Sequence, residues 1–433
     1  MVPNYIASGQ LYRSPAVLLC RSHGNTSPDG AFVDGAAVLM RAVQLTHPPL
    51  PSSDGVASDN GVDHGYDHAF VAICHPEATK SRASLRALGW VIVETEEPIA
   101  AKDIEGEFLK SHILKSGCCG ARELIKLYAW TLTDYHRVVH LDMDSLVLGN
   151  MDELFSRDAS LIYTCDYNMM NHEAKGWQKG AVCPVQGGFV VVRPDARAFA
   201  TMVAIVKEGK FGAGFRAGGS GWNGTGIGHW WGGATFQGVV PFFYAKVAPG
   251  LPVLGRPPGA VAAAVAGVPG PPLKGGSFVS GVAPLLGDPS GDVGGDVGGD
   301  IGGGVNDASV RNRWLAEEVD RCIYDNMVDD PVSKPRAGGE NCRATPLGEV
   351  KNVHFTLCQK PWKCSYARDP ADAQGLCGLL HAKWFELRAA SEARIAIAPA
   401  PRAAAATAAG KYHRGGCERG KYVPMAISAP ALS

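Results

Sequence analysis

The stretch VVHLDMDSLVL, from Val138 to Leu148, places two aspartates, Asp142 and Asp144, inside an otherwise apolar run. A strand that is buried on both faces of a sheet is a continuous run of Val, Ile and Leu. A buried carboxylate without a partner costs several kcal/mol or becomes protonated. The run therefore predicts a buried strand whose aspartates either mark a functional edge of the sheet or cap the end of the strand.

Strands and helices are expected to alternate around this run. Short apolar runs predict strands at 16–20, 68–74, 90–94, 160–165 and 188–192. Apolar residues at helical spacing predict helices at 30–45, 76–88 and 122–133. Asn150 and Glu153 form a capping-box pattern that predicts a short helix at 151–155. This alternation predicts an α/β fold with a Rossmann-like, mostly parallel sheet flanked by helices.

A low-complexity segment interrupts the second half of the chain. From 247 to 308 Gly and Pro are abundant, aspartates recur every four residues from 288 to 300, and one Phe is the only aromatic residue. Such a segment buries too little apolar area to offset its ordering entropy, so we expect a flexible insertion. The alternative is a functional Asp-Gly repeat, although its spacing differs from that of the known calcium-binding nonapeptide.

The insertion sets the expected domain organisation. Residues 1–15 are unassigned, 16–246 and 309–392 are the two parts of one domain, 247–308 is the insertion, and 393–433 is a tail expected to be disordered. Within these parts we expect a Gly- and Trp-rich loop at 218–238, a helix at 310–325 and a last strand at 350–355.

Charge and cysteine content limit the classes of function. The 433 residues include 41 basic and 42 acidic side chains, which gives no overall field for nucleic acid or an anionic membrane. Six of the 12 cysteines lie in about the last quarter: Cys322, Cys342, Cys358, Cys364, Cys377 and Cys417. This clustering favours disulfides and therefore the secretory pathway. The first residues show no signal-peptide pattern, so we expect the natural amino-terminal signal or anchor to be missing from this sequence. The alternative is a reduced cytoplasmic protein.

Two segments carry the candidate chemistry. On one face of a strand end, Asp142 and Asp144 can chelate Mg²⁺ or Mn²⁺ together with substrate phosphates; the alternative is a pair of exposed strand-end carboxylates. In VHFTLCQKPW, from 353 to 362, His354 can complete such a site, and Lys360 can meet a diphosphate as a point charge. Alone, His354 is more often a packed or surface histidine, and Lys360 part of an ordinary turn.

Together these segments resemble a known family. KLYAWTLTDYHRVVHLDMDSLVLGNMDELF, from 126 to 155, is similar to the glycogenin-like retaining glycosyltransferases, also called family eight. Weaker likeness lies in AVLLC, QGGFVVVRPD, GGATFQGVVPFFY and HFTLCQKPW, so that it covers roughly 16–246 and 350–362. The resemblance implies a fold of GT-A type. It also implies transfer of a hexosyl unit from a UDP-sugar to a glycan, lipid or polyol, with Mn²⁺ or Mg²⁺. The Cys-rich region from 342 to 377 separately favours a luminal enzyme that acts on extracellular or Golgi glycans.

The resemblance also implies roles for individual residues. It gives Asp142, Asp144 and His354 as metal ligands, and Lys360 as the lysine that meets the donor diphosphate. It counts Met143, between the aspartates, among the donor-binding residues, and places Leu18, Cys20 and Phe32 beside the uridine. It assigns Lys126, Asp166, Gln186 and Gln237 to the transferred sugar.

Two departures from the family pattern bear on the sugar site. Gln186-Gly187-Gly188 replaces the usual Asn-Ser-Gly, and Phe236-Gln237-Gly238 replaces Asp-Gln-Gly, so an aspartate near the reacting carbon is absent. Trp222, Trp230 and Trp231 are expected either to stack on acceptor sugars or to pack in the core. No carboxylate nucleophile is evident, which favours front-face attack by the acceptor. The alternative functions are UDP-sugar binding without transfer and diphosphate hydrolysis.

Overall fold

The computed structural model describes most of the ordered elements that the sequence predicts. The described residues are 16–20, 29–47, 68–169, 182–212, 220–250, 314–328, 341–365, 375–395, 405–406, 412–413, 416–418 and 420–427. Residues 1–15 and the predicted insertion beyond 250 lie outside the described residues.

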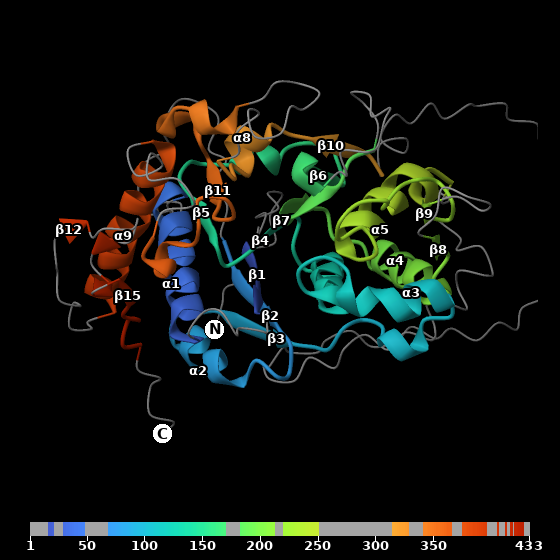
Figure 1. Ribbon diagram of the computed structural model, residues 1–433, viewed down its shortest axis with the longest axis horizontal. Coiled ribbons are helices and arrows are strands. Elements are labelled where there is room, and N and C mark those ends of the chain that lie inside the picture. The colour runs from blue at the N-terminus through green and yellow to red at the C-terminus, as the bar shows by residue number, and fades with distance from the viewer. Residues whose placement is uncertain are drawn as a thin grey trace, which may run out of the picture.

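A seven-stranded sheet forms the centre of the molecule (Figure 1), in the order β10-β6-β7-β4-β1-β2-β3. Its strands are β1 (Ala16–Cys20), β2 (Phe70–Cys74), β3 (Val91–Glu94), β4 (Val138–Leu141), β6 (Leu161–Cys165), β7 (Val185–Val192) and β10 (Ala316–Glu318). β1 pairs in parallel with β2 and β4, β2 with β3, and β10 with β6, whereas β7 is antiparallel to β4 and β6. The predicted α/β fold with a mostly parallel sheet is confirmed.

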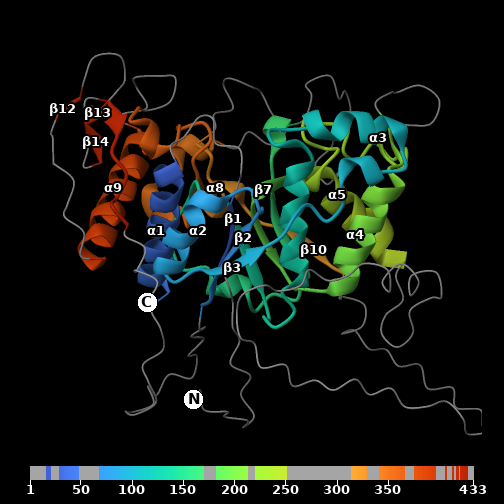
Figure 2. The same ribbon diagram turned by 90° about the horizontal axis from the view of Figure 1, so that it is seen from below.

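Helices lie on both sides of this sheet. The α-helices are α1 (Asp29–Thr46), α2 (Thr79–Ala87), α3 (Glu107–His112), α4 (Ala196–Glu208), α5 (Phe236–Phe242), α8 (Arg321–Tyr324) and α9 (Leu376–Arg394). The 3₁₀-helices are η1 (Ala101–Asp103), η2 (Ile113–Lys115), η3 (Gly120–Thr131), η4 (Asp152–Leu154), η5 (Tyr167–Met169), η7 (Ala248–Gly250), η8 (Cys342–Ala344), η9 (Leu347–Glu349) and η10 (Pro361–Lys363); η6 (Phe243–Val247) is a π-helix. Figure 2 shows α1 and α9 together on one side and α3, α4 and α5 on the other.

Two apolar cores follow from this arrangement. One packs α1 and α9 against the sheet and includes the buried Leu39 and Trp384. The other packs η3, α4 and α5 against the opposite face and includes the buried Trp130 and Phe236. The sheet between them is apolar on both faces, which explains the continuous Val and Leu run of β4.

The run that predicts the central strand is divided in two by its aspartates. β4 ends at Leu141, residues 142–144 form a turn, and β5 (Ser145–Val147) leaves the sheet to pair antiparallel with β11 (Asn352–His354). The other small ladders pair β8 (Phe211–Gly212) with β9 (Gly221–Trp222), β12 (Ala405–Ala406) with β13 (Tyr412–His413), and β14 (Cys417–Glu418) with β15 (Lys421–Tyr422). The aspartates therefore mark the end of a central strand.

Three local predictions are wrong. The helix expected at 310–325 is, in its described part, the edge strand β10 followed by the short α8, because Ala316–Glu318 pairs with the edge of β6. The loop expected at 218–238 ends earlier, where α5 begins at Phe236. The capping box does not form, because the carboxylate of Glu153 accepts hydrogen bonds from Tyr324 and Lys351.

Disulfides tie the C-terminal part together. All six clustered cysteines pair, as Cys322–Cys342, Cys358–Cys377 and Cys364–Cys417, and Cys165–Cys183 is a fourth bridge. The prediction of disulfides is confirmed. The disordered tail expected from 393 onwards is wrong for the described residues 416–418 and 420–427, since Cys417 is bonded to Cys364 and Tyr422 and Met425 contact α1.

Among the helices of the described part of the chain, none is long and apolar enough to cross a membrane.

Candidate functional site

Asp142, Asp144 and His354 converge at the end of β4. Pairing of β5 with β11 brings His354 opposite Ser145, directly after the turn that holds both aspartates. Nε2 of His354 lies 3.5 Å from Oδ1 of Asp144 and 3.8 Å from Oδ2 of Asp142. One ligand atom from each residue lies within 4.8 Å of the others, so the three side chains can hold a single cation. Two carboxylates and an imidazole form a donor set that suits Mn²⁺.

The position of His354 depends on a glycine in β7. Gly188 stands beside the turn, and its carbonyl oxygen accepts the backbone N–H of Asp142 at 3.1 Å. A Cβ atom at Gly188 would lie 2.3 Å from Cε1 and 2.4 Å from Nδ1 of His354. The second glycine of Gln186-Gly187-Gly188 therefore leaves the space that the imidazole ring occupies.

Lys126 lies on one side of the acidic turn. It projects from η3 and is 1% exposed, and its Nζ lies 3.0 Å from Oε2 of Glu123 and 3.2 Å from either carboxylate oxygen of Asp142. It also donates to the carbonyl oxygen of Gly187 at 3.0 Å. Three acceptors thus fix the ammonium group beside the first aspartate, next to the residues expected to hold the sugar.

Lys360 lies on the other side. It precedes η10, donates to the carboxylate of Asp144 and, at 3.2 Å, to the carbonyl oxygen of Phe355. Burial works to raise the pKa of Asp144, but Lys360 and His354 hold it well below its usual range. The cluster is therefore an anionic site that two lysines neutralise.

Charge also governs His354. Burial works to lower the pKa of His354, but the carboxylates of Asp144, Asp325 and Asp142 together raise it to about 9. A cation that binds this ring replaces a proton, because metal ligation requires the neutral imidazole.

The residues expected beside the uridine lie near α1. Phe32, half-buried on α1, packs edge-on against Trp362 of η10 with ring centroids 6.1 Å apart. A Cβ at Gly35, one turn further along α1, would lie 2.8 Å from the carbonyl oxygen of Met143. Met143 itself is buried in the core. Leu18 and Cys20 belong to β1, which pairs with β4, but their side chains lie outside the described residues.

Asp166 and Gln186 form a linked pair at the ends of β6 and β7. Both are buried, and Nε2 of Gln186 donates to Oδ2 of Asp166 at 3.0 Å. Oε1 of Gln186 accepts the backbone N–H of Gly188 at 2.7 Å. The amide of Gln186 thus orients Asp166 and the glycine that faces His354.

Gln237 lies in the first turn of α5, near Lys126. A Cβ at Gly187 would lie 3.1 Å from Nζ of Lys126 and 3.6 Å from Cγ and Nε2 of Gln237. The structure therefore places Lys126 and Gln237 around the same glycine. Of the expected sugar residues, Lys126 contacts the acidic turn directly, and Gln237 lies near Lys126. Asp166 is linked to the turn indirectly, through Gln186 and Gly188.

The aromatic residues of this region have different environments. Phe236, where the family has an aspartate, is fully buried between Trp130 and His140. Trp222 is also fully buried and donates to the carbonyl oxygen of Gly233, so stacking on an acceptor is wrong for this residue. Trp230 is partly buried against the core, whereas Trp231 is 51% exposed.

Sequence reasoning missed three ionisable residues at the site. Glu123 holds Lys126, and its position three residues earlier in a helix was the available signal. His140 is fully buried in β4, with Nε2 3.6 Å from Oδ1 of Asp142. Asp325 lies behind His354, and burial raises its pKa to about 7 despite the opposing effects of His354 and Thr164. Nothing in the local pattern at 310–325 indicated this role.

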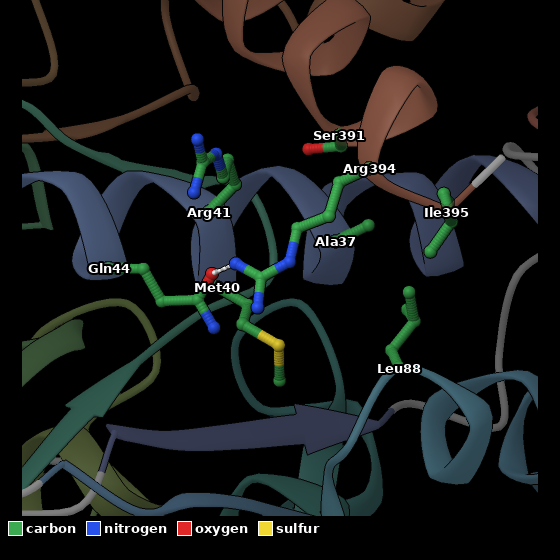
Figure 3. Close-up of a pocket in the computed structure, with 8 residues that line it drawn as sticks. All are labelled: Ala37, Met40, Arg41, Gln44, Leu88, Ser391, Arg394 and Ile395. Carbon is green, nitrogen blue, oxygen red and sulfur yellow. Dashed lines mark hydrogen bonds between the residues drawn. The ribbon is translucent and has the colours of Figure 1, made fainter.

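A separate pocket lies between α1 and α9 (Figure 3). Arg41 and Gln44 of α1, Arg394 of α9 and Leu88 are among the residues that line it, and Arg394 donates to Oε1 of Gln44 at 2.6 Å. None of the residues expected to bind metal or donor lines this pocket.

Comparison with known proteins gives short but clear likenesses. No family model matches the chain. A 71-residue alignment is 44% identical to the putative glucuronosyltransferase PGSIP7 of Arabidopsis thaliana, covering 16% of this chain and 14% of that protein. A 34-residue alignment is 62% identical to glycogenin-2 of Homo sapiens, covering 8% of this chain and 7% of that protein. The chain thus spans 14% or less of the length of these two curated relatives.

Two solved glycosyltransferase structures can be aligned with this chain at low sequence identity. The WbbM bifunctional glycosyltransferase is 10% identical with a TM-score of 0.41, covering 90% of this chain and 51% of that chain. The galactosyltransferase LgtC, in complex with donor and acceptor sugar analogues, is 12% identical with a TM-score of 0.34, covering 87% of this chain and 95% of that chain.

Proposed function

We propose, on the premise that this chain is a glycogenin-like glycosyltransferase, that it moves a hexosyl unit from a UDP-sugar to a hydroxyl group of a glycan, lipid or polyol. The observation that carries this proposal is the cluster of Asp142, Asp144 and His354 between Lys126 and Lys360. Two carboxylates alone are common at strand ends, but a third ligand from a distant segment and two flanking ammonium groups make a site for a cation and a diphosphate.

In this proposal each lysine has a separate task. Asp142, Asp144 and His354 would hold Mn²⁺ or Mg²⁺, and the cation would share the negative charge that develops on the UDP leaving group. Lys360, which is 31% exposed in its side chain, can turn from Asp144 to a phosphate and add a second positive charge there. Lys126 is buried and held by three acceptors, so it keeps its place and faces the sugar.

Retention of the anomeric configuration follows best from attack on the front face. A covalent intermediate needs a carboxylate nucleophile close to the anomeric carbon. Asp166 is buried and accepts a hydrogen bond from Gln186, an arrangement that suits a fixed contact to a sugar hydroxyl better than a nucleophile. Position 236, where relatives of this family have an aspartate, is a core phenylalanine.

The experiment that tests the proposal is transfer of label from a nucleotide sugar. The protein is incubated with labelled UDP-glucose, UDP-galactose or UDP-glucuronate, with Mn²⁺ and a panel of glycan, lipid and polyol acceptors. We expect label on one acceptor class, and loss of that transfer in the double variant Asp142→Asn, Asp144→Asn. The exposed Asp103→Asn variant removes one carboxylate charge far from these aspartates in the sequence and should transfer normally.

The other outcomes correspond to the alternative functions. Free labelled sugar without acceptor indicates a diphosphate hydrolase, and metal-dependent UDP binding without turnover indicates a binding protein. Metal-dependent UDP binding that survives in the double aspartate variant would contradict the site assignment itself.

We further propose that the protein works in the secretory pathway, in the Golgi lumen. Four disulfides in the described residues support an oxidising compartment, since such bridges are rare in the cytosol. Alkylation of free thiols in intact cells tests this, because the eight bridged cysteines should label only after reduction. Labelling of all of them without reduction would favour the cytoplasm.

A further inference from the structure

We propose that Asp325 is the positioning residue of the cation site: when Nε2 of His354 takes the cation, the carboxylate of Asp325 closes the 3.8 Å gap to Nδ1 and accepts its N–H, which holds the ring towards the cation. The inference rests on the proposed function, because it concerns a ligand of the proposed cation. It assigns a role to a residue that no sequence motif marks.

Two buried polar atoms face one another behind the site. Oδ1 of Asp325 and Nδ1 of His354 lie 3.8 Å apart, and neither has a hydrogen-bond partner among the described residues. The side chain of Asp325 is fully buried and that of His354 is 6% exposed. Buried polar groups are almost always paired, so these two atoms are the natural partners of one another.

The other oxygen of Asp325 is already held. Oγ1 of Thr164, buried in β6, donates to Oδ2 of Asp325 at 3.1 Å. This bond fixes the plane of the carboxylate and leaves Oδ1 as the acceptor that faces the imidazole ring. Among the described residues, His354 is also the only basic side chain within ion-pair distance of Asp325.

Backbone pairing holds Asp325 and His354 side by side. The carbonyl oxygen of Asn326 accepts the backbone N–H of His354 at 3.1 Å, and the N–H of Asn326 donates to the carbonyl oxygen of Asn352 at 3.0 Å. The amide of Asn326 donates to the carbonyl oxygens of Cys322 and Cys342, which are joined by a disulfide. Asp325 is therefore mounted on a bridged segment that is paired with the strand of His354.

The chemical consequence concerns the tautomer of the ring. A proton held on Nδ1 by Asp325 leaves the lone pair on Nε2, the atom that faces Asp142 and Asp144. Histidine ligands commonly donate their second ring N–H to a carboxylate, which fixes the ring and makes it more basic. A fully buried carboxylate costs free energy unless a donor such as the Nδ1–H of His354 pairs with it. A purely structural role would therefore not require a carboxylate at position 325.

Asp325→Asn tests the inference by metal binding. Free Mn²⁺ is followed by its paramagnetic resonance signal as the full chain is titrated, in the presence of UDP. We expect the affinity to fall by about 10- to 100-fold, the range typical for loss of an outer partner of a ligand. The matched control is Asp320→Asn, which removes the same charge from the exposed N-cap of the same short helix and should bind Mn²⁺ like wild type.

A second readout follows the ring itself. In protein with ¹⁵N-labelled histidine that is loaded with diamagnetic Mg²⁺ and UDP, Nε2 of His354 is taken by the cation and Nδ1 carries the proton. Its Nδ1–H signal, assigned by its loss in His354→Asn, should lie downfield and exchange slowly with water. In Asp325→Asn this signal should move upfield and exchange faster. An unchanged Nδ1–H signal with unchanged Mn²⁺ affinity in Asp325→Asn would overturn the inference.

Two further outcomes distinguish a variant that does not fold, and a cation that does not bind, from failure of the inference alone. If Asp325→Asn does not fold, Thr164→Val is used instead, because it removes the hydrogen bond that orients the Asp325 carboxylate. A Mn²⁺ affinity of Thr164→Val within about twofold of wild type would overturn the inference. If wild type binds no Mn²⁺, the proposed cation fails and the inference fails with it. Mn²⁺ binding by wild type that Asp325→Asn leaves unchanged overturns the inference alone.

Discussion

Gly188 is the residue on which the place of His354 depends most directly. A Cβ atom there would lie within 3.0 Å of three ring atoms of His354, closer than real side chains approach. Gly188→Ala should therefore drive the ring out of the site. We expect a loss of Mn²⁺ affinity at least as large as the roughly tenfold that loss of an outer ligand partner causes, and a stability cost of about 1–3 kcal/mol for overpacking. Titration of Mn²⁺ and urea unfolding measure the two effects.

The control for this glycine is Gly348→Ala in η9. No atom lies within 4 Å of a Cβ added at Gly348, so the substitution should change neither metal binding nor stability by much. Normal Mn²⁺ binding by Gly188→Ala would show that His354 is not a ligand, or that β7 shifts to make room for it.

Phe236 shows why the absent aspartate cannot be restored by a single change. Its ring is fully buried and packs near Trp130 and His140. Phe236→Asp should lose at least about 3 kcal/mol of unfolding free energy, from the lost apolar volume and from a buried carboxylate without a partner. Urea unfolding checks this, with Phe236→Leu as an apolar control that should lose less. A stable Phe236→Asp variant with higher transferase activity would instead place this position in the sugar site.

At the scale of the element, the turn at 142–144 is the feature that the sequence predicts best. An apolar run that stops at an aspartate already implies a strand end, and the carboxyl ends of strands are where ligands bind in α/β sheets. His354 could be predicted for the same reason, since it ends its own apolar strand. The pairing of β5 with β11 that joins them is a long-range contact, which no local pattern contains.

Asp325 could not be predicted, because the elements around it are too short to leave a periodic signal. β10 has three residues and α8 has four, and both lie beyond the insertion predicted at 247–308. These residues are held in place by contacts with other parts of the chain. β10 pairs with the edge strand β6, Asn326 pairs with β11, and a disulfide joins Cys322 to Cys342. A helical pattern was therefore a poor guide to residues whose structure is set by partners elsewhere in the chain.

The Cys322–Cys342 bridge gives a prediction at this scale. Replacing both cysteines by serine releases a segment whose ends are 20 residues apart, which should lower the unfolding free energy by about 3 kcal/mol. Because Asn326 links this segment to His354, Mn²⁺ affinity should fall as well. Both quantities are measured, by urea unfolding and by Mn²⁺ titration.

The matched control is the Cys165–Cys183 bridge, which closes a loop of similar length, with a sequence separation of 18 between its cysteines. Its double serine variant should lose similar stability but keep Mn²⁺ affinity, because this bridge lies beside Asp166 rather than His354. Equal losses of Mn²⁺ affinity in both variants would mean that the metal site responds to general loosening of the fold.

At the scale of the whole molecule, the C-terminal residues close one side of the fold. α9 packs along α1, and residues 416–418 and 420–427 return over both helices. Asp34 of α1 stands at this junction and accepts hydrogen bonds from Tyr422, from the backbone N–H of Met425 and, at 3.4 Å, from Arg388 of α9. The Cys364–Cys417 bridge ties the same tail to the turn that follows Lys360. The tail thus joins the turn after Lys360, the lysine proposed to meet the diphosphate, to α1.

This junction makes stability depend on pH. Burial raises the pKa of Asp34 from 3.8 to about 6, against the opposing effects of Tyr422, Met425 and Arg388. The folded protein then holds the proton more tightly than the unfolded chain, so the contribution of Asp34 to stability is fully present below pH 3.8 and is lost as the pH rises through about 6.

Asp34→Asn removes this titration and keeps the shape of the side chain. The difference in unfolding free energy, wild type minus variant, should therefore decrease by on the order of 2–3 kcal/mol between pH 4 and pH 7. Urea unfolding at several pH values measures it, and other titrating groups cancel in the difference. Glu418→Gln, which removes an exposed carboxylate from the same tail, is measured beside it as the control. A flat difference for Asp34→Asn would mean that Arg388 and the two hydrogen-bond donors compensate fully for burial, so that the tail stays equally well bound to α1 at either pH.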